Sequence, residues 1–421
     1  MSLKKETREL KILYFTHNSL GIGHAVRTLA VIRGLRKINR NIKFLVVTAS
    51  KVPNIFLDER IEVVKLPSTI FAEGEKGWTL KSRFLDIGIN NIIGMRYKIL
   101  LDCFYSLRPH AVFIDNLLSG QGSELLPIIL HRHIERKTGK TSFLLYLISR
   151  GILDAPAKII TENNRSVHLS TDINLLEVVD KIFIMEDRRM INFNRDYNFG
   201  TKESHFQYLG KIITKTKQDL SKRDDVLKEN GIPLDKKVVL VRLGHENKDV
   251  ELLKTTIQSF KKFNKLHKYK YFLIICSEPY TDKKKVMKLI DGHHDENINH
   301  KVFISDMIDL IYYSEIVISR AGYNITAEIE ATGTKAILIP FEQRTKEQLM
   351  RVRAIKNKRI KYLPEKEATV EKIVNNMNSL SHENFVKNFS SNRDEICKAI
   401  YNNLISDLKR YRKNNHKSND K

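Results

Sequence analysis

Short apolar runs that are rich in β-formers alternate with stretches of helical periodicity along most of the chain. Residues 11–16 (KILYFT) and 42–48 (IKFLVVT) are mostly apolar, as strands are when helices cover both faces of their sheet. Between these runs, apolar residues recur at every third position from Val26 to Leu35 and mark one face of a helix. This alternation predicts parallel strand pairing in a doubly wound α/β sheet.

The alternation occurs twice, so the sequence predicts two domains. At 421 residues the chain is too long for one ordinary core. A second series of strand-like runs begins at VVLVRLG, after a polar and basic segment. We expect an N-terminal Rossmann-like domain over 1–209, a linker over 210–235, a second Rossmann-like domain over 236–390, and a C-terminal helix with a basic tail over 391–421.

Net charge is the unusual bulk property, with 73 Lys and Arg residues against 49 Asp and Glu residues, or +24. Such a charge attracts nucleic acid, an anionic membrane face or a phosphorylated substrate, although a solvated basic surface is an equally simple explanation. The sequence contains no basic–aromatic nucleic-acid module, so nucleic acid is not an expected partner. A charged N-terminus, short apolar runs and three cysteines without a shared motif predict a cytoplasmic protein with reduced thiols.

The segment 18–27 (NSLGIGHAVR) lies where the first strand passes into the first helix. Open parallel sheets bind ligands at the carboxyl ends of their strands. Gly21 and Gly23 allow close approach of another molecule, and the amides of the helix start favour a negative group. His24 at this position is suited to act as a neutral general base. A Gly-x-Gly pair is common, however, and a histidine there can also serve only to cap the helix.

Residues 317–351 (VISRAGYNITAEIEATGTKAILIPFEQRTKEQLMR) form the most informative segment. Small residues at a strand-to-helix turn, together with the amides of the helix start, make a diphosphate cradle. Glu328 lies about one turn into the expected helix, where its carboxylate can reach a ribose diol. Gln348, in the expected loop after the next strand, can bond sugar hydroxyls as donor and acceptor.

This segment resembles the donor-site signature of GT-B glycosyltransferases, and it is most similar to family 28, which includes the peptidoglycan N-acetylglucosaminyltransferase. The Gly-x-Gly-His-x-x-Arg loop resembles that family's N-terminal acceptor-side motif. Residues 149–156 (SRGILDAP) resemble a segment of an uncharacterised bacterial subgroup of predicted glycosyltransferases. The resemblance implies an α/β protein of the GT-B class, with two doubly wound Rossmann-like domains facing each other across a cleft.

The resemblance also implies roles for individual residues. The catalytic pair would be His24, as base or phosphate-side stabiliser, and Gly23. The donor site would contain Ile304, Arg320, Ala321, Gly322, Tyr323, Asn324, Thr326, Glu328, Glu347 and Gln348. Phosphate and crevice loops would contribute Gly21, Arg27, Arg242 and Gly244. Within the donor site, Ile304 would hold the base, Glu328 the ribose, and Glu347 with Gln348 the sugar.

Two departures from the family pattern are visible. The loop after the first strand of the second domain has Gly244 alone where relatives are glycine-rich, and His245 or Arg242 could substitute there. Arg320 occupies a position where many relatives have a small residue.

Together these observations predict a glycosyltransferase that moves a hexose-type sugar from a nucleoside diphosphate sugar, with uridine as the expected nucleoside. The acceptor is unidentified, and it is lipid-linked in many relatives. Helix amides and basic side chains can stabilise the leaving diphosphate, so neither a metal nor another cofactor is expected. A sugar-nucleotide hydrolase or epimerase on the same fold, or a non-catalytic sugar-nucleotide binder, remains an alternative. The charge favours peripheral attachment to the inner membrane face.

Overall fold

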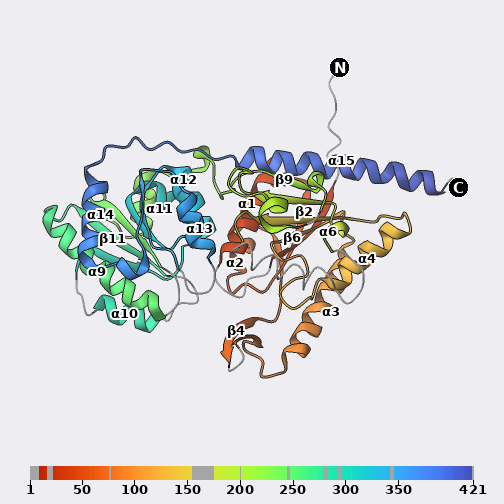
Figure 1. The fold of residues 1–421 in the computed structure, drawn as a ribbon, viewed down its shortest axis with the longest axis horizontal. Helices are drawn as coiled ribbons and strands as arrows, with labels where there is room; N and C mark the ends of the chain where they lie inside the picture. The colour runs from red at the N-terminus through yellow and green to blue at the C-terminus, as the bar shows by residue number, and fades with distance from the viewer. Residues whose placement is uncertain are drawn as a thin grey trace, which may run out of the picture. The chain divides into compact units, whose positions relative to one another are not determined.

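The computed structural model describes residues 9–16, 22–74, 77–153, 175–199, 201–243, 247–277, 283–291, 295–304, 306–341 and 346–419 (Figure 1). The chain divides into two compact units. Unit 1 contains residues 1–212 and 392–421, and unit 2 contains residues 213–391.

The described part of unit 1 contains a seven-stranded sheet in the order β3-β2-β1-β6-β7-β8-β9, and every neighbouring pair is parallel. Its strands are β1 (Leu10–Thr16), β2 (Ile42–Thr48), β3 (Glu62–Lys65), β6 (Ala111–Asp115), β7 (Leu144–Arg150), β8 (Lys181–Met185) and β9 (Phe206–Tyr208). Its helices before residue 212 are α1 (Gly23–Ile38), α2 (Asn54–Leu57), α3 (Ile89–Leu107), α4 (Leu126–Lys137), α6 (Leu175–Val178), α7 (Phe193–Tyr197) and the 3-10 helix η1 (Glu203–His205).

An antiparallel hairpin, β4 (Thr69–Gly74) and β5 (Gly77–Ser82), is inserted between β3 and α3 (Figure 1). The sequence pattern did not predict this hairpin, because its short strands carry no apolar run of the kind that marks the parallel strands.

The described part of unit 2 contains a six-stranded parallel sheet in the order β12-β11-β10-β13-β14-β15. Its strands are β10 (Lys237–Arg242), β11 (Tyr271–Cys276), β12 (Ile298–Lys301), β13 (Ser314–Ser319), β14 (Lys335–Leu338) and β15 (Ile360–Tyr362). Its helices are α8 (Arg223–Glu229), α9 (Asn247–Leu266), α10 (Lys283–Asp291), α11 (Ile308–Tyr313), α12 (Tyr323–Thr332), α13 (Glu347–Ala354) and α14 (Val370–His382), with 3-10 helices η2 (Lys217–Asp219) and η3 (Glu365–Glu367).

Strand β10 shows why the strands of unit 2 read as continuous apolar runs. Val239 and Val241 pack into a core that includes side chains from α9 and α14. Val238 and Leu240 pack into a second core, with side chains from α8, α11 and α12. Because successive side chains of a strand point to opposite faces, both faces of this sheet are covered, which confirms the doubly wound α/β class.

The range 210–235, expected to be a linker, contains α8, and Val226 and Leu227 of this helix are buried in the core of unit 2. The division between units falls at Ile212 and Ile213, near the start of this range, and most of the range belongs to unit 2. The few apolar side chains of this range are separated by lysines and acids, so the helix left only a weak apolar pattern.

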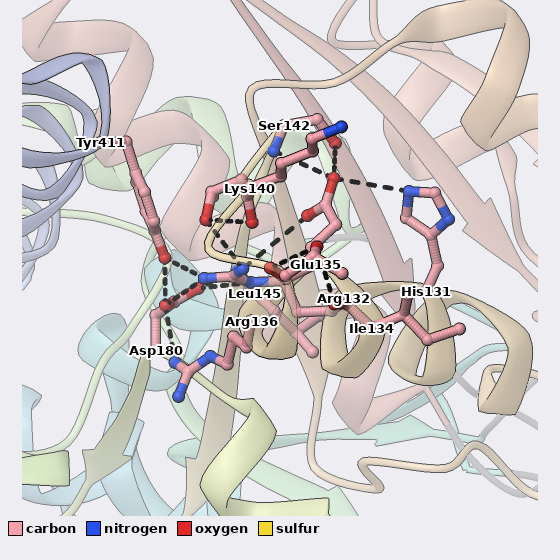
Figure 2. Close-up of polar contacts among 12 residues, drawn as sticks. His131, Arg132, Ile134, Glu135, Arg136, Lys140, Ser142, Leu145, Asp180 and Tyr411 are labelled. Atoms are coloured by element: carbon pink, nitrogen blue, oxygen red, sulfur yellow. Dashed lines mark hydrogen bonds and ion pairs between the residues drawn. The ribbon is translucent and has the colours of Figure 1, made fainter. Parts of the chain in front are cut away.

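The C-terminal helix α15 (Arg393–Asn419) belongs to unit 1 and packs against α1. At Gly34 of α1, a Cβ atom would lie 2.3 Å from the Cys397 sulfur, so the two helices approach closely. Figure 2 shows a second attachment point, where Tyr411 of α15 meets Asp180 and the buried Arg132 of α4. Among the described residues, no helix combines the length and the apolarity needed to cross a bilayer.

Candidate active site

His24, the second residue of α1, forms a close pair with Asp115 in unit 1. Its Nδ1 lies 2.5 Å from Asp115 Oδ2, and the Asp115 side chain is fully buried. Asp115 ends β6, and the parallel register places it opposite Thr16, the last residue of β1. The carboxyl ends of two adjacent strands therefore bring the imidazole and the carboxylate together.

Arg27 completes this cluster one turn further along α1. Its Nε donates to Asp115 Oδ1 at 2.8 Å, and its Nη2 donates to Asp115 Oδ2 at 2.9 Å. This bidentate contact neutralises the buried carboxylate and fixes its orientation. Arg27, expected to lie on a crevice loop, is only 2% exposed and supports Asp115.

The environment of His24 suits a neutral general base. Burial lowers the pKa of His24 and outweighs the opposing effect of Asp115, while Arg27 and Arg150 lower this pKa further. When Asp115 accepts the Nδ1 proton, the basic lone pair of the ring is on Nε2. The α1 N-cap is Ile22, and no side chain caps this helix, so His24 contacts Asp115 rather than serving as a cap. Gly23 is the first residue of α1, and Gly21 lies outside the described residues.

Sequence reasoning did not single out Asp115, although a signal was present. An acid ends the otherwise apolar run AVFID, and a buried acid at the carboxyl end of a strand is unusual without a partner. Its significance depends on the strand order, which places β6 beside β1 although β2 and β3 intervene in the chain.

In unit 2, the turn and helix expected from residues 317–333 are present. Strand β13 ends at Ser319, α12 begins at Tyr323 after the N-cap Gly322, and it ends at Thr332 before Gly333, whose φ is +64°. No side chain caps the α12 N-terminus among the described contacts. Its amides are thus arranged as an anion site requires.

Two residues of this turn use their side chains within the protein. The Thr326 hydroxyl lies 2.8 Å from the Gly322 carbonyl oxygen and 2.9 Å from that of Tyr323, so it bonds back into its own helix. The Arg320 guanidinium donates to Asp249 at 2.7 Å and to Glu365 at 2.7 Å. Arg320 therefore ties β13 to α9 and η3, contrary to the expected diphosphate contact of its side chain. These acids explain how unit 2 holds a buried arginine at this turn.

Glu328 is the most unusual charged residue of unit 2. It is 4% exposed, and its Oε2 has no hydrogen-bond partner among the described residues. Burial raises the pKa of Glu328 to about 8, with Arg242 opposing this shift and Asp306 adding to it. Arg242 ends β10, which pairs with β13, so the acid lies near the carboxyl ends of these strands. A polar ligand there could supply the hydrogen bonds that the protein does not.

Glu347 and Gln348 lie in the first turn of α13, not in the loop expected from the sequence. The carboxylate of Glu347 forms an ion pair with Arg351. The Gln348 Oε1 accepts the backbone N–H of Ala321 and that of Phe341, each at 3.0 Å. Both partners are donors, so this contact assigns the orientation of the Gln348 amide.

The remaining expected residues are placed as follows. Ala321 and Tyr323 are buried, and Asn324 is partly exposed on the first turn of α12. Ile304 is half-buried against the core of unit 2. Gly244 lies outside the described residues. Within the described part of the chain, no group of three His, Cys, Asp or Glu residues is arranged to hold a metal ion.

Known proteins resemble this chain in part of its sequence and in its fold. Residues 248–400 match the glycosyltransferase family 28 C-terminal domain. The chain is 28% identical over 154 residues to an N-acetylglucosaminyltransferase of Acetivibrio thermocellus that acts on pyrophosphoryl-undecaprenol-linked N-acetylmuramyl pentapeptide, covering 37% of this chain and 40% of that protein. The enzyme of the same name from Finegoldia magna is 23% identical over 400 residues, covering 91% of this chain and 94% of that protein. The chain spans about half, or less, of the length of the first curated relatives it matches.

Solved structures share the fold over almost the whole chain. The kitacinnamycin glycosyltransferase has a TM-score of 0.60 at 13% identity, covering 98% of this chain and 99% of that chain. A UDP-N-acetylglucosamine 2-epimerase homologue from Listeria monocytogenes has a TM-score of 0.61 at 12% identity, covering 95% and 97%. At these identities the likeness concerns the fold alone. The match over residues 248–400 makes the second part of the chain similar to the C-terminal domain of glycosyltransferase family 28.

Proposed function

We propose that this protein is a glycosyltransferase that moves a hexose-type sugar from a uridine diphosphate sugar to an acceptor hydroxyl without a metal ion. The observation that carries the proposal is the buried Glu328, whose Oε2 lacks a partner among the described residues. Glu328 lies on α12, the helix whose N-cap is Gly322. A nucleoside diphosphate offers matching groups, because its ribose has two adjacent hydroxyls and its diphosphate is an anion.

Unit 2 would bind the donor. The ribose hydroxyls would donate to the Glu328 carboxylate, and the diphosphate would accept N–H groups at the start of α12. The NH₂ group of Gln348 would donate to the sugar, since its carbonyl oxygen holds two backbone amides. Charge that develops on the leaving diphosphate would be stabilised by these amides and by the α12 dipole, without a metal.

Unit 1 would activate the acceptor. The acceptor hydroxyl would give its proton to His24 Nε2 as its oxygen forms a bond to the anomeric carbon. The bond between that carbon and the diphosphate oxygen would break, and the nucleoside diphosphate would leave with the electron pair. Asp115 would stabilise the imidazolium that forms and hold the ring in one orientation.

The proposal is tested by following donor consumption and product mass with a panel of uridine diphosphate sugars. We expect transfer that requires an acceptor and falls at least a hundredfold in His24→Gln, the usual size of a general-base contribution. His131→Gln, at a partly exposed position of α4, is the matched control and should keep full activity. Wild-type turnover in His24→Gln would refute the assigned base.

The same assay separates the alternatives from the proposal. Rapid breakdown or isomerisation of the donor without any acceptor would favour a hydrolase or epimerase. The epimerase alternative is relevant because the fold also occurs in the Listeria monocytogenes protein. Donor binding with no turnover on any acceptor would favour a non-catalytic binder.

We further propose that unit 1 works at an anionic membrane face, where it would meet a lipid-linked acceptor. The segment between β5 and α3 exposes three large apolar side chains, with Phe84 at 73%, Leu85 at 46% and Ile87 at 41%. The Arg83 guanidinium lies 5.6 Å from the centre of the Phe84 ring, so a cation accompanies this apolar segment. Apolar side chains beside cations are suited to insert between anionic headgroups, and the net charge of +24 adds a general attraction.

A further inference from the structure

The turn that begins α12 is held from both sides by α13. The Ala321 N–H donates to Gln348 Oε1 at 3.0 Å, and the Ala321 carbonyl oxygen accepts from Arg351 Nη1 at 2.7 Å. Gln348 and Arg351 lie one turn apart on α13. Both polar groups of Ala321 are therefore bound by side chains of one helix.

Arg351 is held in this position by burial and by several contacts. It is 1% exposed, and its second arm forms an ion pair with the buried Glu347 of the same helix. Its guanidinium carbon also lies 5.8 Å from the centre of the Tyr323 ring, at the first residue of α12. The planar guanidinium thus contacts a carbonyl, a carboxylate and an aromatic ring. A lysine ammonium group cannot reproduce this set of contacts.

The contact with Ala321 fixes the direction of the next N–H group. A peptide unit is planar and trans, so the Ala321 carbonyl and the Gly322 N–H point in opposite directions. Since Arg351 holds the carbonyl on one side, the Gly322 N–H must point to the other. The Ala321 N–H is already bound to Gln348, so the Gly322 N–H is the first one after it whose direction the Arg351 contact sets.

We propose that Arg351 is a positioning residue that sets the orientation of the diphosphate-binding amides at the start of α12. The inference rests on the proposed function, because it assumes that this turn binds the donor diphosphate. Arg351 would act through the Ala321 carbonyl, since its two arms are bound to Ala321 and Glu347.

The test compares two ligands that differ only in the diphosphate. Binding of UDP and of uridine is measured by titration calorimetry for the wild type, Arg351→Lys and the control Arg353→Lys, whose side chain is exposed on the same helix. We expect Arg351→Lys to bind UDP about tenfold more weakly, the size of one lost hydrogen bond to a charged group, with uridine affinity within twofold of the wild type. Arg353→Lys should bind both ligands normally.

Each other outcome has a defined meaning. Unchanged UDP affinity in Arg351→Lys, or an equal loss for UDP and uridine, would overturn the positioning role and leave the proposed function standing. A wild type that binds neither ligand would overturn the proposed function as well.

A second variant covers the case in which Arg351→Lys does not fold. UDP lacks the transferred hexose, so a Gln348 that contacted only that hexose would leave UDP affinity unchanged in Gln348→Leu. We expect instead a loss of UDP affinity without a loss of uridine affinity, because the Ala321 N–H loses its acceptor. Normal UDP binding by this variant would count against positioning by α13.

Discussion

Replacing Glu328 with glutamine should stabilise the unliganded protein while weakening donor binding. The pKa of this carboxyl rises from 4.5 to about 8 because burial disfavours its charged form. The folded state therefore binds the proton more tightly than the unfolded state, and stability falls as pH rises from about 4.5 to about 8. A neutral glutamine of similar shape does not have this dependence.

The size of the stability difference between Glu328→Gln and the wild type follows from the raised pKa of Glu328. At pH 7 the unfolded carboxyl is ionised, about 2.5 pH units above its pKa of 4.5, while the folded carboxyl keeps its proton. This difference costs the wild type roughly 3 kcal/mol of stability at pH 7, a cost that the glutamine variant does not have. For a unit of this size, 1 kcal/mol moves the melting temperature by roughly 2–4 °C. We therefore expect Glu328→Gln to melt roughly 6–12 °C above the wild type at pH 7, and close to it at pH 4.5.

Differential scanning calorimetry from pH 4.5 to 8.5 measures this difference, with Glu330→Gln, two residues along the same helix, as control. Other titrating groups affect both proteins equally, so the difference between the curves isolates Glu328. A constant difference across this pH range, or a glutamine variant that is less stable throughout, would refute the reasoning.

Donor binding by the wild type should strengthen as pH rises, whereas the stability of the unliganded protein should fall. Ribose hydroxyls donate to the ionised carboxylate, so binding must remove its proton, and the wild-type affinity for a uridine diphosphate sugar should rise with pH until about pH 8. The diphosphate of such a donor does not titrate in this range. Glu328→Gln should show weaker binding with no such rise. Equal donor affinity in the two proteins would separate this buried acid from the donor site.

Three further predictions concern unit 1. Asp115→Asn should lower kcat about a hundredfold or more in a transfer assay and leave the donor KM within twofold, because the His24 ring loses the carboxylate that orients it. Gly34→Ala should reduce the free energy of unfolding by about 1–3 kcal/mol in urea titrations, since its Cβ would lie 2.3 Å from the Cys397 sulfur; Cys397→Ala should restore only part, because the Cys397 Cβ is itself 2.8 Å away. Phe84→Ser should reduce co-sedimentation with phosphatidylglycerol vesicles, and unchanged co-sedimentation would exclude this segment as the contact.

The sequence predicted those parts of the fold whose causes are local. Apolar residues at every third position marked α1, and Leu29, Ile32 and Leu35 are buried as that pattern requires. The turn before α12 and its end at Gly333 were also predicted, because Gly333 has the positive φ that favours glycine. Each of these features is determined by residues within a few positions of one another.

The parts that the sequence did not reveal depend on contacts between distant residues. The sequence predicted a diphosphate contact for Arg320 because it could not reveal the actual partners of this side chain. These partners, Asp249 and Glu365, lie 71 and 45 positions away in the chain. Asp115 was overlooked for the same reason, since 91 positions separate it from His24. The packing of α15 against unit 1 could not be predicted either, because it depends on which helix faces Gly34. Periodicity indicates what is buried, but not against what.

The partners of a buried charge therefore distinguish the architectural residues of this protein from the candidate functional ones. Arg320 has two acids, and Arg96 is paired with Glu124 where both side chains are fully buried. Such partners offset part of the free energy lost when charge leaves water, so contacts within the protein explain these two arginines. Glu328 is buried as deeply, but Oε2 has no such compensation among the described residues, and its raised pKa reflects that loss. Glu328 lies near the carboxyl ends of the strands and about one turn from the start of α12, which no side chain caps. A ligand that supplies the missing donors best explains why the fold keeps an acid there despite the free energy that its burial costs.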